Sequence, residues 1–448
     1  MLDPQTAEER AAALVQRALR AGADAADAIY HADSSESIQV RLGKLEDVER
    51  SESEHIGLRV FVGRSSASIG STDLGDGALD ELASRALAMA RSAPEDAYSG
   101  LAPAELLTKG PYAALDLVDP VEPSPAALKE LALAAEDAAR GVAGITNSEG
   151  AGASSGRGVF ALATSHGFSG AYESTSHGLS ASVIGGEGGT MQRDHAWRSA
   201  RHLADLPSAQ EIGLLAGERT VRRLNPGTLP SGAMPVVFDP RVGGTLIGHL
   251  LSAMAGSAIA RRSSFLLDRD GAQLFDSAVS IVEDPHRPRA LRSRPFDGEG
   301  LATTRRALVD GGKITGWLMD SASARQLGSA PTGHASRGGG GAPGVSTGNI
   351  HLGPGTVTPA ELIADIADGV YVTELIGQGV NGVTGDYSRG AAGFRITNGE
   401  IGPAVAEFTI AGNLLDMFAS LIPANDLEWY RATNVPTLRI DGMTIAGE

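Results

Sequence analysis

Apolar positions in the first hundred residues recur at two different spacings. Spacings of three and four predict helices over residues 3–21 and 76–93, and Gly22 is a typical helix stop. Between these helices, residues 37–49 and 56–63 alternate apolar with polar side chains, which predicts strands, and the second continues through a tight turn as a hairpin. The pattern therefore indicates a helix, an antiparallel sheet and a second helix.

The middle of the chain contains the same two patterns in a different order. Residues 124–141 and 209–225 predict helices, and the second stops at Pro226-Gly227. Between them lie short alternating segments separated by Gly and Ser, most clearly over residues 158–186. Segments of this kind predict an antiparallel β-meander.

The rest of the chain is predicted to be largely β. Residues 230–240 indicate a short buried strand, and an uncharged helix rich in small residues follows at 241–260. Tight turns of the hairpin type are then predicted at Asp310-Gly311-Gly312, Asn398-Gly399 and Asp441-Gly442.

The uncharged helix is long enough to raise the question of a membrane span. Its Gly, Ala, Ser, Thr and His content makes it too weakly apolar to cross a bilayer, so we expect a buried helix. Thr245, His249, Ser252 and Gly256 follow a four-three-four spacing, which predicts one narrow face that admits a close neighbour.

These elements predict an α+β fold in three regions. We expect an N-terminal helix–antiparallel sheet–helix domain over residues 1–98 and a central α+β region of helix and β-meander over residues 120–228. A β-rich C-terminal domain is expected over residues 229–448. The irregular, proline-bearing stretch after residue 93 is a plausible linker between the first two regions.

Charge and cysteine content narrow the function classes. The formal net charge is −17, which disfavours direct nucleic-acid binding because the chain repels phosphate unless it carries a local basic stripe. Cys is absent, which excludes disulfides, thiolate metal ligands and a Cys nucleophile and fits a reducing cytoplasm. The charged, amphipathic N-terminus has no apolar signal region, so we expect a cytoplasmic protein without a membrane partner.

Several short motifs match catalytic patterns, yet their surroundings argue against each. Residues 152–156 and 344–348 read Gly-x-Ser-x-Gly, but neither is followed by the helix that a nucleophile elbow requires. Gly339, Gly341 and Gly344 satisfy Gly-x-Gly-x-x-Gly without a preceding strand. We therefore interpret residues 330–350 as a mobile loop that orders on binding.

The ten His residues form no metal-binding pattern. His195 and His202 lie seven apart and, if helical, fall on one face two turns apart, too far to share a zinc ion, so we expect solvated helix residues. His249 stands alone in the small-residue helix and is predicted to be a packed, hydrogen-bonded side chain.

Residues 373–418, a glycine-rich stretch with a strong hairpin signal, carry a resemblance to a known family. Together with residues 37–63, 147–150 and 248–268, they resemble the TldE/PmbA branch of the TldD/PmbA family, over essentially the whole chain. The resemblance implies a cytoplasmic protein linked to metal-dependent proteolysis, historically also called a modulator of DNA gyrase.

The resemblance also implies where a zinc site would stand in the other branch. In TldD proteins a helix carries His-Glu-x-x-x-His, and a Cys near the C-terminus completes the site. The corresponding positions here are Gly248, His249 and Ala253, or His249, Leu250 and Met254 if the register shifts by one. Either register loses the general base and a ligand. The resemblance therefore implies no catalytic residue, metal ligand or cofactor in this chain, and zinc in its partner.

The partner implied by the resemblance is a TldD-type zinc-bearing subunit that forms a heterodimer around extended, unfolded peptides. A homodimer is left open when that partner is absent. The stretch 377–394 concentrates backbone freedom that lets a chain approach a peptide closely. Its polar side chains are our candidates for peptide or partner contact: Asn381, Thr384, Asp386, Ser388 and Arg389. The alternative is an internal Asp386–Arg389 ion pair that closes the turn.

Three functions remain on this basis. The first is a non-catalytic subunit of a zinc metalloprotease that degrades or processes peptides and unfolded proteins. The second is an autonomous hydrolase with an unrecognised site, supported only by the serine motifs. The third is a regulatory or binding protein of the gyrase-modulator type that acts without proteolysis.

Overall fold

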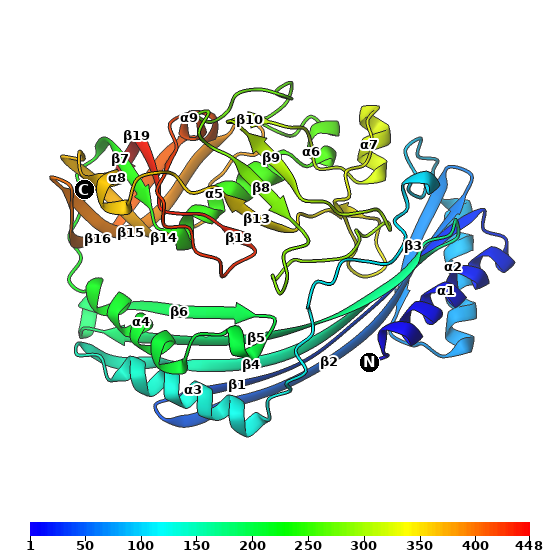
Figure 1. Cartoon of the computed structure of the whole chain (residues 1–448), viewed down its shortest axis with the longest axis horizontal. Coiled ribbons are helices and arrows are strands. Elements are labelled where there is room, and N and C mark those ends of the chain that lie inside the picture. The colour runs from blue at the N-terminus through cyan, green and yellow to red at the C-terminus, as the bar shows by residue number, and fades with distance from the viewer.

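A curved sheet of six antiparallel strands runs across the N-terminal half of the computed structural model, which describes residues 1–448 (Figure 1). Its strand order is β3-β2-β1-β4-β5-β6. The first and central regions share this sheet because β1 pairs with β4 along most of its length. The strands are β1 (Ala25–Arg41), β2 (Lys44–Val62), β3 (Ser65–Ser71), β4 (Ile145–Thr164), β5 (Ser169–Gly185) and β6 (Gln192–Ala200).

Four helices cover the convex face of this sheet, and the C-terminal region lies over its concave face (Figure 1). They are α1 (Pro4–Ala21), α2 (Asp76–Ser92), α3 (Pro125–Arg140) and α4 (Ala209–Arg222). Apolar side chains of α1 and α2 form one core with the sheet, and those of α3 and α4 form another. As predicted, α1 ends at Gly22, whose φ of 107° is left-handed.

The larger sheet of the C-terminal region closes on itself. Its order is β16-β15-β14-β7-β19-β17, and β16 also pairs with β19, so five of the strands form a barrel. The strands are β7 (Gly232–Phe238), β14 (Asp368–Ile376), β15 (Asp386–Thr397), β16 (Glu400–Asn413), β17 (Ile422–Pro423) and β19 (Leu438–Ala446). The hairpin predicted at Asn398-Gly399 joins β15 to β16.

A second C-terminal sheet has the order β10-β9-β8-β13-β18. Its strands are β8 (Ile281–Asp284), β9 (Arg306–Asp310), β10 (Lys313–Ile314), β13 (Asn349–Leu352) and β18 (Thr433–Asn434), and a two-stranded ladder joins β11 (Ala335–Ser336) to β12 (Gly344–Val345). A buried apolar core, which includes Phe238, Leu250 and Phe418, joins the barrel to this sheet.

Short helices complete the fold. They are α5 (Pro240–Ala253), α6 (Gly256–Ala260), α7 (Ser321–Leu327), α8 (Pro359–Ile363) and α9 (Leu414–Ala419), with 3-10 turns at Ala104–Leu106, Gly188–Thr190 and Leu203–Asp205. The α+β class is confirmed, with the predicted helix–sheet–helix start and β-rich C-terminal region. No helix in the structure combines the length and the apolar character needed to cross a bilayer.

The predicted helix 241–260 is wrong as a single element. It breaks between α5 and α6, where the backbone of Gly256 donates to the carbonyl of Leu318 instead of continuing the helix. The predicted small-residue face is therefore not continuous, and Ser252 on it is exposed. The buried face of α5 is the apolar one, which includes Leu246 and Leu250.

The predicted C-terminal hairpin at Asp441-Gly442 is also wrong. These two residues form a bulge within β19, which continues to pair with β7 on both sides of them. Gly442 has φ 74°, so the same turn-forming residues kink a strand here instead of reversing it.

Candidate functional site

Helix α5 carries the positions at which the resemblance places the zinc motif of the TldD branch. Gly248 is exposed and Ala253 is buried in the apolar core, so neither offers a ligand atom. In the shifted register, Leu250 and Met254 are likewise buried apolar side chains. His249 is the one imidazole on this helix.

His249 lies beside the strand that follows the glycine-rich loop. Its ring meets Tyr387 of β15 edge-on, with 6.1 Å between the ring centroids. Burial and then the positive charge of nearby Arg389 hold the pKa of His249 below its ordinary value. The imidazole Nε2, the Tyr387 hydroxyl and the Arg389 Nε are all buried without a hydrogen-bond partner. The predicted hydrogen bond of His249 is therefore absent at Nε2.

These residues do not fit a zinc ion. A zinc site needs three or four ligands, and here a single imidazole stands next to a guanidinium cation that would repel a divalent metal. Across the whole structure, no group of three or more His, Asp and Glu side chains is placed to hold a metal ion.

The glycine-rich loop itself, residues 377–385, is exposed and held by its own hydrogen bonds. The Asn381 side chain accepts from the backbone of Val383 and Thr384, at 2.9 and 3.3 Å. Thr384 donates to Asp386 at 2.6 Å, and Asn413 donates to the same carboxylate at 3.2 Å. These two bonds lower the pKa of Asp386. The loop is thus a preformed turn, and Val383 on it and Ile376 just before it are exposed at 56% and 58%.

The five contact candidates do not share one face. Asn381, Thr384, Asp386 and Ser388 are exposed, whereas Arg389 is 8% exposed and lies on the opposite side of β15 from Asp386. The alternative Asp386–Arg389 ion pair is not formed, because Asp386 takes its hydrogen bonds from Thr384 and Asn413. Burial raises the pKa of Tyr387, the neighbour of Arg389, to about 12.

The two serine motifs and the pair His195 and His202 do not have the geometry of a catalytic site. Ser154 lies inside β4 and Ser346 follows the short strand β12, so neither stands on a strand-to-helix elbow. The prediction that His195 and His202 lie in a helix is wrong. His195 lies in strand β6 and is exposed, as predicted, whereas its neighbours Asp194 and Ala196 point inward. His202 is not solvated, because it is buried between Asp116 and Asp119.

The segment predicted as a mobile loop does not stand free of the fold. Arg337 is buried and pairs with Asp27 of β1, which also pairs with Arg59 of β2. The backbone of Gly340 lies directly against that of Gly57, because a Cβ on Gly57 would be 2.7 Å from the Gly340 Cα. This segment therefore joins the C-terminal region to the curved sheet.

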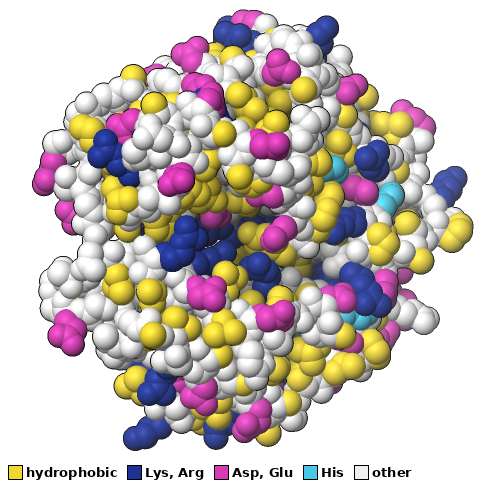
Figure 2. Space-filling view, turned by 60° about the vertical axis from the view of Figure 1, so that its left-hand side comes forward, with side chains coloured by type: hydrophobic (Ala, Val, Ile, Leu, Met, Phe, Trp, Pro, Cys, Tyr) yellow, Lys and Arg dark blue, Asp and Glu magenta, His cyan; other side chains and the backbone are white.

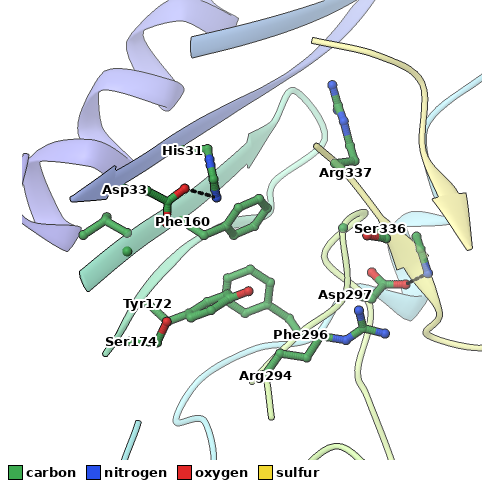
Figure 3. A pocket seen from close by; sticks show the side chains of 14 residues that line it. His31, Asp33, Phe160, Tyr172, Ser174, Arg294, Phe296, Asp297, Ser336 and Arg337 are labelled. Atoms are coloured by element: carbon green, nitrogen blue, oxygen red, sulfur yellow. Dashed lines mark hydrogen bonds and ion pairs between the residues drawn. The ribbon is translucent and has the colours of Figure 1, made fainter. Parts of the chain in front are cut away.

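A small hollow of about 200 Å³ lies beside this junction (Figure 3). The rings of Phe160, Tyr172 and Phe296 line one side of it, and Asp297 and Arg337 lie on the other. Burial raises the pKa of Asp297 to about 6, although the carboxylate accepts backbone hydrogen bonds from residues 299, 301 and 335. This hollow lies in the contact between the C-terminal region and the curved sheet, which we call the seam.

A larger hollow, of about 440 Å³, lies between β6 and the C-terminal region. Figure 2 shows Lys and Arg side chains gathered between the two layers of the molecule. We name this hollow the arginine pocket; it is lined by Arg198, Ser199, Ala200, Asp205, Pro207, Arg287, Pro288, Arg289, Ala290, Leu291, Trp429, Tyr430 and Arg431.

Three family models cover most of the chain. They match residues 26–90, 118–224 and 231–447, and they describe domain 1, the central domain and the C-terminal domain of the PmbA/TldA metallopeptidases. The chain belongs to the PmbA/TldD family. Metalloprotease PmbA of Escherichia coli O157:H7 is 39% identical over 95% of this chain and 93% of its own length. The Metalloprotease PmbA homolog of Haemophilus influenzae is 36% identical over 97% and 94%.

Solved structures of PmbA/TldD type have the same fold. A candidate modulator of DNA gyrase from Bacteroides thetaiotaomicron aligns over 100% of both chains with a TM-score of 0.91 and 27% identity. TldE from Thermococcus kodakarensis aligns over 97% of this chain and 99% of its own, with a TM-score of 0.84 and 19% identity. The resemblance found in the sequence is thereby confirmed.

The sequence does not predict the arginine pocket. A signal was present, because Trp197 precedes Arg198 directly and Trp429 lies two residues before Arg431. Nothing in the sequence indicates that these two pairs and the segment around Arg287 meet in one hollow.

Proposed function

We propose that this chain is the non-catalytic subunit of a zinc-dependent metallopeptidase that acts on peptides and unfolded proteins in the cytoplasm. The observation that carries this proposal is helix α5, where the motif positions of a metallopeptidase family hold Gly248 and Ala253, and His249 faces Arg389. The reaction centre is then supplied by a TldD-type partner that holds the zinc ion.

Two surfaces support a partner. One is the exposed loop 377–385 together with Ile376 at the end of β14, where Ile376 and Val383 lie next to polar side chains, a composition typical of protein contacts. The tip of the β1–β2 hairpin is the other, because β3 pairs with β2 only from Ile56 onward. This leaves the preceding part of β2 with an unpaired edge, and Leu45 and Val48 on it are about half exposed.

The contact candidates take distinct roles in this proposal. Asn381, Thr384, Asp386 and Ser388 meet the partner or its peptide directly, since they are exposed. Arg389 is buried beneath them, and its charge disfavours protonation of His249 instead.

The test combines metal analysis with a cleavage assay. This chain, a TldD-type partner and the two together are each assayed on a denatured protein, and zinc is counted by mass spectrometry. We expect chelator-sensitive cleavage by the pair and a stable heterodimer on gel filtration. One zinc ion per chain with cleavage by this chain alone would refute the proposal. Cleavage by the partner alone, unchanged when this chain is added, would favour a regulatory protein.

A further inference from the structure

The arginine pocket holds three arginines that have no acidic partner. Arg198, Arg287 and Arg431 make no ion pair, whereas Arg289 in the same pocket is neutralised by Asp116 and Asp205. The chain carries a net charge of −17, so carboxylates are abundant enough to have paired with them. Three unpaired cations around one hollow therefore make a local positive site on an acidic protein.

Aromatic rings hold each of these guanidinium groups in place. Arg198 lies over the ring of Tyr430 at 4.0 Å, and Arg287 lies over that of Trp429 at 3.9 Å. Arg431 is 5.1 Å from the centre of the Tyr430 ring. Arg198 and Arg431 each donate one hydrogen bond to a backbone carbonyl, and Arg287 makes no side-chain hydrogen bond. The stacked guanidinium groups therefore keep further N–H groups at their edges, where they fit a carboxylate.

The pocket lies at an open strand edge. Strand β6 pairs with β5 on one side and has no strand on the other, and Arg198 and Ser199 near its end line the pocket. No strand covers this edge, and the carbonyls of His195 and Trp197 accept hydrogen bonds from the side chains of Arg219 and Arg198 instead. An extended peptide that displaces these side chains can pair with the edge through its backbone.

We infer that the arginine pocket binds carboxylates of an extended acidic peptide segment that lies along the edge of β6. The inference rests on the proposed function, in which this chain holds part of the peptide substrate, and adds the chemistry by which it selects that substrate. Aspartate and glutamate side chains or a C-terminal carboxylate supply the same group. The net charge of −17 disfavours a nucleic-acid backbone, because a long polyanion is repelled outside the pocket.

The direct test measures binding of fluorescent peptides to the full chain by anisotropy at low salt. The peptides share one length, enough to span the nine residues of β6, and are rich in Asp, Gln or Lys. We expect the Asp-rich peptide to bind at least tenfold tighter than the Gln-rich one and to weaken as salt is added. Versions with an amidated C-terminus separate side-chain carboxylates from the terminal one.

Arginine substitutions locate the site. Arg198→Gln and Arg287→Gln should each weaken the Asp-rich peptide about tenfold, since each removes a charge-assisted contact. Arg20→Gln on α1 is the matched control, because this exposed side chain makes no hydrogen bond or ion pair and the charge change is the same. Unchanged binding in both pocket variants, or equal binding of Asp-rich and Gln-rich peptides, would overturn the inference.

A charge-reversal variant distinguishes loss of the binding site from misfolding of the protein. The double variant Arg198→Glu with Arg287→Glu should lose the Asp-rich peptide and gain the Lys-rich one, and a damaged protein would gain nothing. Tighter binding of a single-stranded oligonucleotide than of the Asp-rich peptide would also overturn the inference.

Two outcomes distinguish this inference from the proposed function. If acidic peptides bind but no zinc-bearing partner assembles, the proposed function fails and the pocket stands. If the complex cleaves and peptide acidity has no effect, the pocket fails and the proposed function stands.

Discussion

Two glycine-rich segments of the C-terminal region use glycine for different physical reasons. Residues 337–340 press their backbone against the curved sheet, where a Cβ on Gly340 would lie 2.8 Å from the backbone of Ile69. In the loop 377–385, Gly377 and Gly385 have φ near 80°, and the loop closes on itself. The first segment joins two parts of the molecule, and the second presents side chains to solvent. Glycine content alone therefore does not distinguish a packed seam from a contact loop.

The largest loss of stability is expected from substitution of the buried charges that hold residues 337–340 against the curved sheet. Asp27→Ala leaves Arg59 and Arg337 buried without a carboxylate, which should lower the free energy of unfolding by about 3–5 kcal/mol. Burial raises the pKa of Asp27, but the charges of Arg337 and Arg59 outweigh it and hold that pKa below its ordinary value. The stabilisation is thus present at neutral pH and is lost in strong acid as the carboxylate takes up a proton.

Urea denaturation measures this loss, with Asp47→Ala on the exposed part of β2 as the control. If Asp27→Ala and Asp47→Ala unfold at the same urea concentration, the seam does not depend on this carboxylate and the packed segment is no more anchored than the loop.

At Asp297, in the same contact between the C-terminal region and the curved sheet, stability should depend on pH in the opposite direction. Its pKa is raised to about 6 in the folded protein, so between about pH 4 and 6 the folded state keeps a proton that the unfolded chain has released. The free energy of unfolding should therefore fall as pH rises through this range, by up to about 3 kcal/mol from this group.

The comparison that isolates Asp297 uses Asp297→Asn, which removes the titrating group. Its difference from the wild type should change with pH between 4 and 6 and stay constant above that range. A difference independent of pH would mean that the carboxyl is ionised throughout and that the seam contains no protonated acid.

The sequence predicts the curved sheet better than the seam. The strand predicted over residues 56–63 and its hairpin into β3 are confirmed, because the alternation of side chains there is local. The single strand predicted over residues 37–49 is wrong, because Leu42-Gly43 within it form the turn that joins β1 to β2. The Asp27–Arg337 pair joins residues 310 apart, and no local pattern of charge or glycine indicates it.

At the candidate site, too, local features can be predicted from the sequence and distant contacts cannot. The missing ligands at Gly248 and Ala253 follow from residue identity, whereas the contact of His249 with Tyr387 depends on how α5 packs against β15. The prediction for His202 failed because burial between Asp116 and Asp119 depends on a distant segment.

A smaller effect is expected from a methyl group added to the packed segment. Gly340→Ala places a Cβ against the backbone of Ile69 and Gly70 and should cost about 1–3 kcal/mol, since backbone cannot move aside easily. Gly341→Ala is the matched control, because a Cβ there meets nothing within 4 Å. Thermal unfolding of both variants is the measurement; equal midpoints would show that the segment tolerates side chains as a free loop does.

The smallest effect on stability is expected at the exposed loop 377–385 and at Ile376 just before it, where the effect on assembly should be largest. Ile376→Ser and Val383→Ser remove side chains that are more than half exposed, so each should change the free energy of unfolding by less than about 0.5 kcal/mol. If a TldD-type partner covers these side chains, each loss should weaken the heterodimer about tenfold or more, because burying such a side chain is worth about 1.5–3 kcal/mol.

The control for this last prediction is Met89→Ser on α2, a side chain that is 46% exposed and lies in the other half of the molecule. Titration calorimetry with the partner gives the affinity, and thermal unfolding gives the stability. Loop variants that bind the partner as tightly as Met89→Ser would remove this loop from the interface. The unpaired part of β2 around Leu45 and Val48 would then be the surface to test, because it is the other exposed edge with apolar side chains.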